Sequence, residues 1–292
     1  MMRPDNLRTQ IFLDSGDVED SKDVLHKIGF LDGQTTNPSL VSKNPEVKKC
    51  LNANKTCSRD DIYSYYKGIV QEVSSFMPGK SVSVEVYADD NTTSDEMVEE
   101  GKRLNEWIST AHIKLPTTQE GLQAAHELTQ AGLRVNMTLV FTQEQAAAVH
   151  AATKGAKKGD VFLSPFIGRL DDIGQYGLDL IFNCLKMYRE QDSHVQVLAA
   201  SIRSYDHLMH CMAMGCDIVT VPSKMLKLWG RKGMQLSGPY ERPKTYLSGI
   251  AFEELDLSGP VESFNLKHEV DAWELTQTGI ERFVKDWKSL IG

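Results

Sequence analysis

Eight short runs of apolar and β-branched residues recur along this chain, and longer stretches with helical spacing separate them. The runs cover residues 11–15, 32–36, 81–86, 112–115, 134–140, 161–165, 196–200 and 218–221. Short strands that alternate with helical patterns are typical of βα units and of a parallel sheet. Eight such units are the number that closes into a barrel. The sequence therefore predicts an α/β protein with a (β/α)8 TIM-barrel fold.

Helical patterns fill the intervals between these runs. Apolar side chains recur on one helix face in residues 20–28, 120–131 and 206–215. The interval 43–80 is longer than a minimal barrel requires, and it predicts a small extra helix in addition to the usual one.

The part of the chain after the eighth run divides in two. Residues 228–260 are rich in Gly, Pro, Ser and charged residues and predict an extended segment. Residues 267–291 carry apolar side chains, among them Phe283 and Trp287, at the spacing of an amphipathic helix. This stripe is typical of core packing; a lid over the barrel mouth or a subunit contact is the alternative. We expect one domain over residues 1–292, with the barrel core at about 11–228 and the extension and helix at about 229–292.

Charge and cysteine content narrow the class of protein. The net charge of −8, from 40 acidic and 32 basic residues, argues against a broad nucleic-acid or acidic-membrane surface. The five cysteines form no CxxC pair, which fits a reducing compartment. No signal-peptide pattern opens the chain, and no run reaches about 18 apolar residues. We expect a cytoplasmic protein without nucleic-acid or membrane partners, and a homo-oligomer is compatible with these features.

Polar residues gather at the predicted strand ends, where a (β/α)8 barrel builds its active site. Seven of the eight strands carry them at or just beyond their C-terminal ends. The candidate site residues are Asp14, Asn37, Glu85, Lys114, Asn136, Thr138, Ser164, Arg169, Ser201 and Arg203.

Lys114 stands at the end of an apolar run, ahead of Pro116 and of a helix that Thr117 or Thr118 can cap. A lysine in this place either extends its amine to solvent or points it into the apolar interior. In the second case the loss of solvation favours the neutral amine, which is a nucleophile for carbonyl carbon. This motif alone leaves both readings open.

Glu85 lies inside the apolar run 81–86. Alternation along a strand puts it on the same face as Ser83 and opposite Val84 and Val86. A buried carboxylate needs a partner or a raised pKa. Lys114 on the adjacent strand is the predicted partner, either directly or through a shared water.

Several of the other candidates have structural alternatives. Asp14 also fits a cap for the loop that follows it, and Asn37 before Pro38 is a common turn pair. Arg169 and Arg203 would form surface ion pairs in most proteins.

The position of these two arginines favours a phosphate clamp. They follow the sixth and seventh strands, with Ser201 beside them, and guanidinium groups match phosphate oxygens.

The eight histidines show no metal-ligand spacing, and the chain has neither a GxSxG motif nor a Gly-rich nucleotide loop. We interpret His112 as a packed histidine rather than a base.

Four motifs in this order resemble the transaldolase family. They are TTNPSL at 35–40, IKLP at 113–116 with Glu120 and Gly121, NMTL at 136–139, and SPFIGR at 164–169. The resemblance covers roughly residues 11–221. Residues 279–287 also look like the C-terminal helix of the short members, which include fructose-6-phosphate aldolases. The resemblance implies a (β/α)8 enzyme that acts on sugar phosphates without a metal or an organic cofactor.

The resemblance also implies a role for each candidate residue. Lys114 would form a Schiff base with a ketose phosphate, and Asp14 would exchange the proton of the substrate hydroxyl on carbon 4. Glu85, with Thr138 and a bound water, would move protons during imine formation and hydrolysis. The substrate hydroxyls would be held by Asn37, Asn136 and Ser164, and the phosphate by Arg169, Ser201 and Arg203.

Two positions divide this family. Transaldolases carry glutamate on the third strand and phenylalanine at the end of the fifth, whereas the aldolases have glutamine and a tyrosine that helps water release dihydroxyacetone. Glu85 and Phe141 are the residues assigned to these positions here. The resemblance therefore implies transfer of a dihydroxyacetone unit between phosphorylated sugars of the pentose phosphate pathway. A fructose-6-phosphate aldolase and a non-catalytic sugar-phosphate-binding relative are the alternatives.

Overall fold

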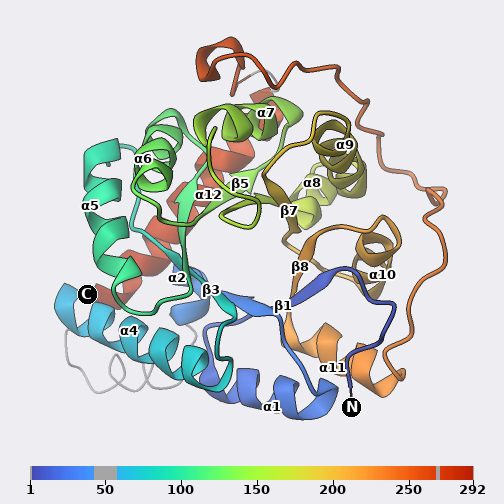
Figure 1. Ribbon diagram of the computed structural model, residues 1–292, viewed down its shortest axis with the longest axis horizontal. Coiled ribbons are helices and arrows are strands. Elements are labelled where there is room, and N and C mark those ends of the chain that lie inside the picture. Colours follow the sequence, from blue (N-terminus) through green and yellow to red (C-terminus); the bar gives the residue numbers. More distant parts are fainter. Residues whose placement is uncertain (1, 43–57, 268–269, 292) are drawn as a thin grey trace.

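The computed structural model describes residues 2–42, 58–267 and 270–291 (Figure 1). The strands are β1 (Gln10–Asp14), β2 (Gly33–Thr35), β3 (Ser81–Glu85), β4 (Ala111–Pro116), β5 (Val135–Val140), β6 (Val161–Pro165), β7 (Gln196–Ala199) and β8 (Ile218–Val221). The helices are α1 (Val18–Ile28), α2 (Pro38–Val41), α4 (Arg59–Phe76), α5 (Ser94–Asn105), α6 (Gln119–Gln130), α7 (Gln143–Ala152), α8 (Ile167–Asp172), α9 (Gly177–Glu190), α10 (Tyr205–Ala213), α11 (Ser223–Arg231) and α12 (Val270–Ile291), with a short 3-10 helix η1 (Val261–Ser263).

The strands form a closed parallel barrel in sequence order, with helices around it (Figure 1). β1 pairs with β8, so that Ile11 lies opposite Val219 and the barrel has no open edge. The predicted TIM barrel is therefore confirmed. Every predicted run overlaps a strand and differs from its bounds by at most one residue at either end. β4 continues through Pro116, which lies opposite Thr138, so that this proline is the last residue of the strand.

Side-chain caps fix where the predicted helices begin. Asp17, Thr118 and Ser204 each accept a hydrogen bond from a backbone N–H in the first turn of α1, α6 and α10. Of the two candidate caps after Lys114, Thr118 is therefore the one used. α1 ends at Gly29, whose φ of 84° is the left-handed conformation in which glycine commonly ends a helix.

Helix α4 accounts for the second part of the predicted segment 43–80. Ser58 and Asp61 form a reciprocal capping box at its start, and Ile62 and Tyr66 lie on its buried face. The predicted extra helix falls at residues 43–57, outside the described residues.

Three rings pack inside the barrel below its mouth. Phe12 and Phe162 meet edge to face at 5.9 Å, and His112 stacks on Phe162 at 3.9 Å. The two ring nitrogens of His112 are hydrogen-bonded to the Ser81 hydroxyl at 2.7 Å and the Gly159 carbonyl at 3.0 Å. His112 is thus a packed, fully bonded histidine, as the sequence indicated.

Helix α12 packs across the barrel mouth, in contact with α2, β5 and α4 (Figure 1). The backbone at Leu139 has a φ of 59°, next to a register shift in β5, and its carbonyl accepts a hydrogen bond from Thr276 Oγ1 at 3.1 Å. Gly279 permits this close approach, because a Cβ there would lie 2.6 Å from the Leu139 side chain. The apolar stripe of this helix is therefore buried packing that also covers the mouth.

The chain between α11 and η1 runs along the outside of the barrel past α10 and α9 toward α7 (Figure 1). It has little regular structure, as predicted, although α11 extends to Arg231 and so includes the first residues of the predicted segment 228–260. Hydrogen bonds from helix side chains hold it. Asn183 Nδ2 donates to the Ile250 carbonyl at 3.0 Å, and Arg242 donates to Asp179 at 2.8 Å.

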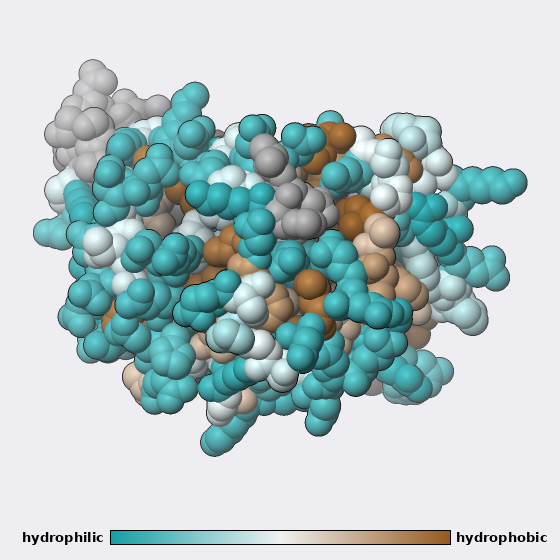
Figure 2. Space-filling view, turned by 90° about the horizontal axis from the view of Figure 1, so that it is seen from above, coloured by the Kyte–Doolittle hydropathy of each residue, from teal (hydrophilic) through white to brown (hydrophobic). Residues whose placement is uncertain are grey.

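The face shown in Figure 2 is mainly hydrophilic, and hydrophobic residues show only in small areas between the polar ones. Among the described helices, none is both long enough and apolar enough to cross a membrane.

The buried ring of His112 predicts a loss of stability in acid. Burial lowers the pKa of His112 from 6.5 to about 3, and nearby Arg134 adds to this effect. Below pH 6.5 the unfolded chain takes up a proton that the folded chain does not accept, so the unfolding free energy should fall from pH 6.5 toward 3. His112→Gln should reduce this slope by about 1.4 kcal/mol per pH unit. Urea denaturation at several pH values measures it.

His26→Gln is the control, because His26 is exposed on α1. This variant should keep the slope of the original protein. An unchanged slope in His112→Gln would contradict the role assigned to the buried ring.

Candidate active site

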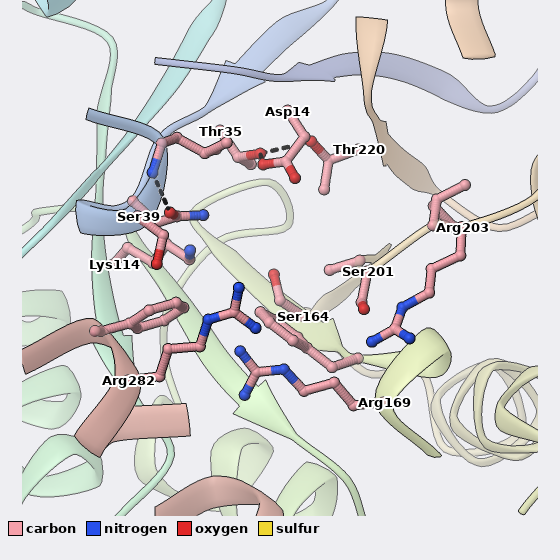
Figure 3. Close-up of a pocket in the computed structure, with 16 residues that line it drawn as sticks. Asp14, Thr35, Ser39, Lys114, Ser164, Arg169, Ser201, Arg203, Thr220 and Arg282 are labelled. Atoms are coloured by element: carbon pink, nitrogen blue, oxygen red, sulfur yellow. Dashed lines mark hydrogen bonds between the residues drawn. The ribbon is translucent and has the colours of Figure 1, made fainter. Parts of the chain in front are cut away.

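A cavity of about 370 Å³ opens at the C-terminal ends of the strands, a size suited to a small molecule (Figure 3). The predicted site residues that line it are Asp14, Asn37, Lys114, Ser164, Arg169, Ser201 and Arg203. Figure 3 shows Asp14, Thr35 and Thr220 along one side, and the guanidinium groups of Arg169, Arg203 and Arg282 on the other.

Lys114 and Glu85 form a buried pair at the base of this cavity. Lys114 Nζ lies 2.9 Å from Glu85 Oε2, and the two side chains are only 4% and 5% exposed. The amine therefore points into the barrel rather than to solvent. Burial raises the pKa of Glu85, while the charges of Lys114 and Arg169 act in the opposite direction. If the ammonium passes its proton to the carboxylate, both groups become neutral and the amine becomes a nucleophile.

Neighbouring groups fix the position of this pair. The Thr36 carbonyl accepts a hydrogen bond from Lys114 Nζ at 3.5 Å, and the Phe283 ring lies 5.7 Å from the same nitrogen. Tyr66 Oη accepts a hydrogen bond from the Glu85 backbone N–H at 3.0 Å and lies 2.6 Å from Thr36 Oγ1. The fully buried tyrosine of α4 thus ties β2 to β3 next to the pair.

Asp14 borders the cavity in a polar setting. Thr35 Oγ1 donates to Asp14 Oδ1 at 2.9 Å, and Thr220 lies next to Thr35. The carboxylate is part of the cavity surface. The two carboxylates of the site therefore differ, because Glu85 is buried against a cation whereas Asp14 borders the open space.

Asn37 forms the turn that one interpretation of the sequence predicted, and it also lines the cavity. Its Oδ1 accepts a hydrogen bond from the Leu40 N–H at 2.9 Å, as in a turn or a helix cap. It also lines the cavity.

A line of hydrogen bonds crosses the barrel interior beneath the cavity. Asn136 Nδ2 donates to Ser83 Oγ at 3.0 Å, and Ser164 Oγ donates to Asn136 Oδ1 at 2.6 Å. Ser164 borders the cavity, whereas Asn136 is completely buried and does not line it. Asn136 is therefore connected to the cavity surface by its hydrogen bond with Ser164.

Thr138 is also completely buried and lies outside the cavity lining. Among the described residues its hydroxyl has no hydrogen-bond partner. A buried hydroxyl without a protein partner is commonly satisfied by an ordered water.

Three arginines give the cavity a cationic end. Arg203 is paired with Asp172. Arg169 is largely buried, and its guanidinium lies 5.2 Å from the Phe166 ring. Burial and the nearby charges of Arg282 and Arg203 lower the pKa of Arg169 to about 10. Like charges gathered in a partly desolvated place favour an anionic ligand, since an anion relieves their repulsion.

Phe141 lies directly after β5, as assigned, but it does not reach the cavity surface. Its side chain is 1% exposed and lies outside the cavity lining, and its ring meets the Phe166 ring edge to face at 6.0 Å. Phe166, in the SPFIGR motif, lines the cavity instead. The backbone turns at Leu139, and the end of β5 packs under α12, so that the residue directly after this strand is buried behind Phe166.

The cavity is also lined by Arg282, Phe283 and Ser39, which were not predicted from the sequence as site residues. The amphipathic pattern of residues 267–291 was a usable signal for the first two, because it predicted a helix that covers the mouth as one alternative. Within the described ranges, no group of three or more His, Cys, Asp or Glu side chains is placed to hold a metal ion.

Comparisons with known sequences identify one family. The transaldolase/fructose-6-phosphate aldolase family model matches residues 11–292. A probable transaldolase of Dehalococcoides mccartyi is 33% identical over 96% of this chain and 99% of its own length. A probable transaldolase of Cereibacter sphaeroides is 38% identical over 75% of this chain and 86% of its own length. A mutant tryptophan synthase alpha-subunit from Pyrococcus furiosus aligns with a TM-score of 0.46 and 13% identity, over 94% of this chain and 96% of that one.

The cationic end of the cavity predicts that inorganic phosphate binds there. Phosphate should raise the unfolding temperature, because it binds the folded chain. Arg169→Gln should weaken phosphate binding by about tenfold or more, since a charge-assisted hydrogen bond contributes about 1.5–3 kcal/mol. Calorimetry gives the Kd. Arg231→Gln, at an exposed position on α11, should leave the Kd unchanged. Equal Kd values in the two variants would contradict the site.

Proposed function

Because this chain belongs to the transaldolase/fructose-6-phosphate aldolase family, we propose that it is a transaldolase. It transfers a dihydroxyacetone unit from a ketose phosphate to an aldose phosphate through an imine on Lys114. Sedoheptulose 7-phosphate and fructose 6-phosphate are the proposed donors, and glyceraldehyde 3-phosphate and erythrose 4-phosphate the proposed acceptors. This places the reaction in the pentose phosphate pathway.

The buried pair of Lys114 and Glu85 is the observation that carries this proposal. The amine lies at the base of a small-molecule cavity, 2.9 Å from a carboxylate whose pKa is raised by burial. In imine formation the neutral amine adds to the ketone carbon, the carbonyl oxygen takes up protons, and water leaves. Glu85 accepts and returns the protons of these steps.

Asp14 is the proposed base for carbon–carbon bond cleavage. It takes the proton of the hydroxyl on carbon 4, the bond between carbons 3 and 4 breaks, and its electron pair moves to the iminium nitrogen. An aldose phosphate leaves, and an enamine of three carbons stays on Lys114. The hydrogen bond from Thr35 Oγ1, at 2.9 Å, supports this role because it stabilises the ionised carboxylate. The reverse steps join the unit to the acceptor.

The remaining lining residues hold the substrate in this proposal. Asn37 and Ser164, with Asn136 behind Ser164, bind hydroxyl groups of the dihydroxyacetone unit. Arg169, Ser201 and Arg203 bind the phosphate, and we add Arg282 to this group because its charge lies next to that of Arg169. Within the described part of the chain the Thr138 hydroxyl has no hydrogen-bond partner, which supports a water bound there that takes part with Glu85 in imine hydrolysis.

Phe166 is the proposed determinant of transfer over cleavage, in place of Phe141. The enamine on Lys114 is lost as free dihydroxyacetone if a proton and water reach it before the acceptor does. An apolar ring in the cavity lining offers no hydroxyl to assist that loss. The carboxylate of Glu85 next to Lys114 agrees with the same branch of the family.

Borohydride trapping tests the imine. With fructose 6-phosphate, reduction should leave a three-carbon adduct on Lys114, identified by mass spectrometry of the digested protein. Lys114→Met should abolish the adduct, whereas Lys102→Met, at an exposed lysine of α5, should keep it. An adduct on another lysine, or none with either ketose phosphate, would rule out the proposed mechanism.

Product analysis with and without an aldose phosphate tests the partition between transfer and cleavage. Free dihydroxyacetone should form slowly without an acceptor. Phe166→Tyr should increase its release by about tenfold or more, because a positioned proton donor contributes at least that much to such a step. Phe141→Tyr is the matched control and should change release little, since Phe141 lies outside the cavity lining. A larger effect in the Phe141 variant would instead assign the selecting role to Phe141, as the sequence predicted.

A further inference from the structure

A hydrogen bond joins the C-terminal helix to the segment that follows β2. Ser39 Oγ in α2 donates to Asp286 Oδ2 in α12. Ser39 is buried, and Asp286 is half-buried. The two residues are far apart in sequence, so this bond fixes α2 from outside its own region of the chain.

Helix α2 is a single turn and needs such support. One turn of helix is not stable alone, because its hydrogen bonds do not offset the ordering of its backbone. Asn37 caps it from within, through Leu40. On its other side the loop after β1 packs directly on it, since a Cβ on Gly16 would lie 2.6 Å from the Leu40 carbonyl carbon. α2 is therefore held between the loop that follows Asp14 and helix α12.

The residues of this turn face the reacting end of the cavity. Asn37 and Ser39 line it, and the Thr36 carbonyl accepts a hydrogen bond from Lys114 Nζ at 3.5 Å. A displacement of α2 therefore changes the surroundings of the amine. Arg203 lies across the cavity from Ser39 and Lys114 (Figure 3).

Helix α12 does not depend on Asp286 for its own place. Ile280, Phe283 and Trp287 are buried, and Thr276 is hydrogen-bonded to the Leu139 carbonyl. Burial of three large apolar side chains contributes several kcal/mol, more than one hydrogen bond at a half-exposed carboxylate. The bond from Ser39 to Asp286 is thus better suited to placing α2 than to holding the helix.

We infer that Asp286 is a positioning residue, which acts through Ser39 to place Asn37 and the Thr36 carbonyl around Lys114. The inference rests on the proposed function. It assigns the C-terminal helix a part in imine formation, in addition to covering the mouth. Asp286 itself lies outside the cavity lining.

The test compares Asp286→Ala, Ser39→Ala and the double variant. Each single variant should slow borohydride-dependent trapping of fructose 6-phosphate on Lys114 by about tenfold or more, because small displacements of reacting groups reduce rates by such factors. The double variant should be no slower than the slower single variant, since both changes break the same bond. The Kd for inorganic phosphate should stay unchanged, whereas a general loosening of α12 would displace Arg282 and weaken it.

Two further variants complete the design. Asp286→Asn keeps an acceptor oxygen for Ser39 and should stay within about threefold of the original trapping rate. Glu274→Ala removes an exposed carboxylate from the same helix and should have no effect. Because Ser39→Ala breaks the bond from the other side, it provides the test even if Asp286→Ala does not fold.

The inference is overturned if Ser39→Ala and Asp286→Ala trap at the original rate, or if their effects multiply in the double variant. Multiplied effects would mean that Ser39 acts on the substrate directly. It is also overturned if phosphate affinity falls in parallel with trapping. Failure of the unmodified protein to form any adduct would instead overturn the proposed function.

Discussion

Lys114 and Glu85 lie against each other in a barrel interior that shields both from water, and the other parts of the site are arranged around this pair. Burial of two charges costs several kcal/mol for each ion, and their attraction offsets this only when the geometry is good. The separation of 2.9 Å and the bonds to Thr36 and Tyr66 supply that geometry. The same proximity lets a proton pass between the two groups without leaving a net charge in the interior. A pair that is costly to bury is therefore suited to making a neutral amine.

Helix α12 completes an enclosure that the barrel strands leave open. The strands supply Asp14, Lys114 and Ser164 from below, while Arg282 and Phe283 enter from the helix above. Phe283 lies near the amine and also near Arg169, so one ring contacts both the reacting end and the cationic end of the cavity. An apolar ring in this place reduces the access of water to both charges. The cavity is thus formed by the repeated βα units together with the added helix α12.

The repeated βα pattern allowed the fold to be predicted, because strand runs and helical stripes depend on local alternation that is visible in the residues themselves. The candidate site residues were predicted from the rule that a barrel gathers its site at one mouth, where the strands end. This rule selected Asp14, Asn37, Lys114, Ser164 and the arginines after β6 and β7. Phe141 follows β5 as assigned, but its burial behind Phe166 was not predictable, because the turn at Leu139 is not visible in local alternation. Arg282 was missed because its place depends on how α12 crosses the barrel, which is a long-range contact. Asn136 and Thr138 were found, but their depth below the cavity depends on strand register and was not predictable.

The pairing of β1 with β8 has a consequence for how the site assembles. Ile11 and Val219 meet across a loop of about two hundred residues, so that this contact carries the largest entropy of loop closure in the sheet. Asp14 and Thr220 lie on the two sides of this seam, whereas Lys114 and Glu85 belong to neighbouring strands far from it. A chain with an open seam would still hold the amine beside its carboxylate, and Asp14 would still be paired with Thr35 of β2, but Thr220 of β8 would no longer lie against Thr35. Closure of the seam therefore completes the polar surroundings of Asp14, whereas the buried pair of Lys114 and Glu85 is formed by two strands that pair without it.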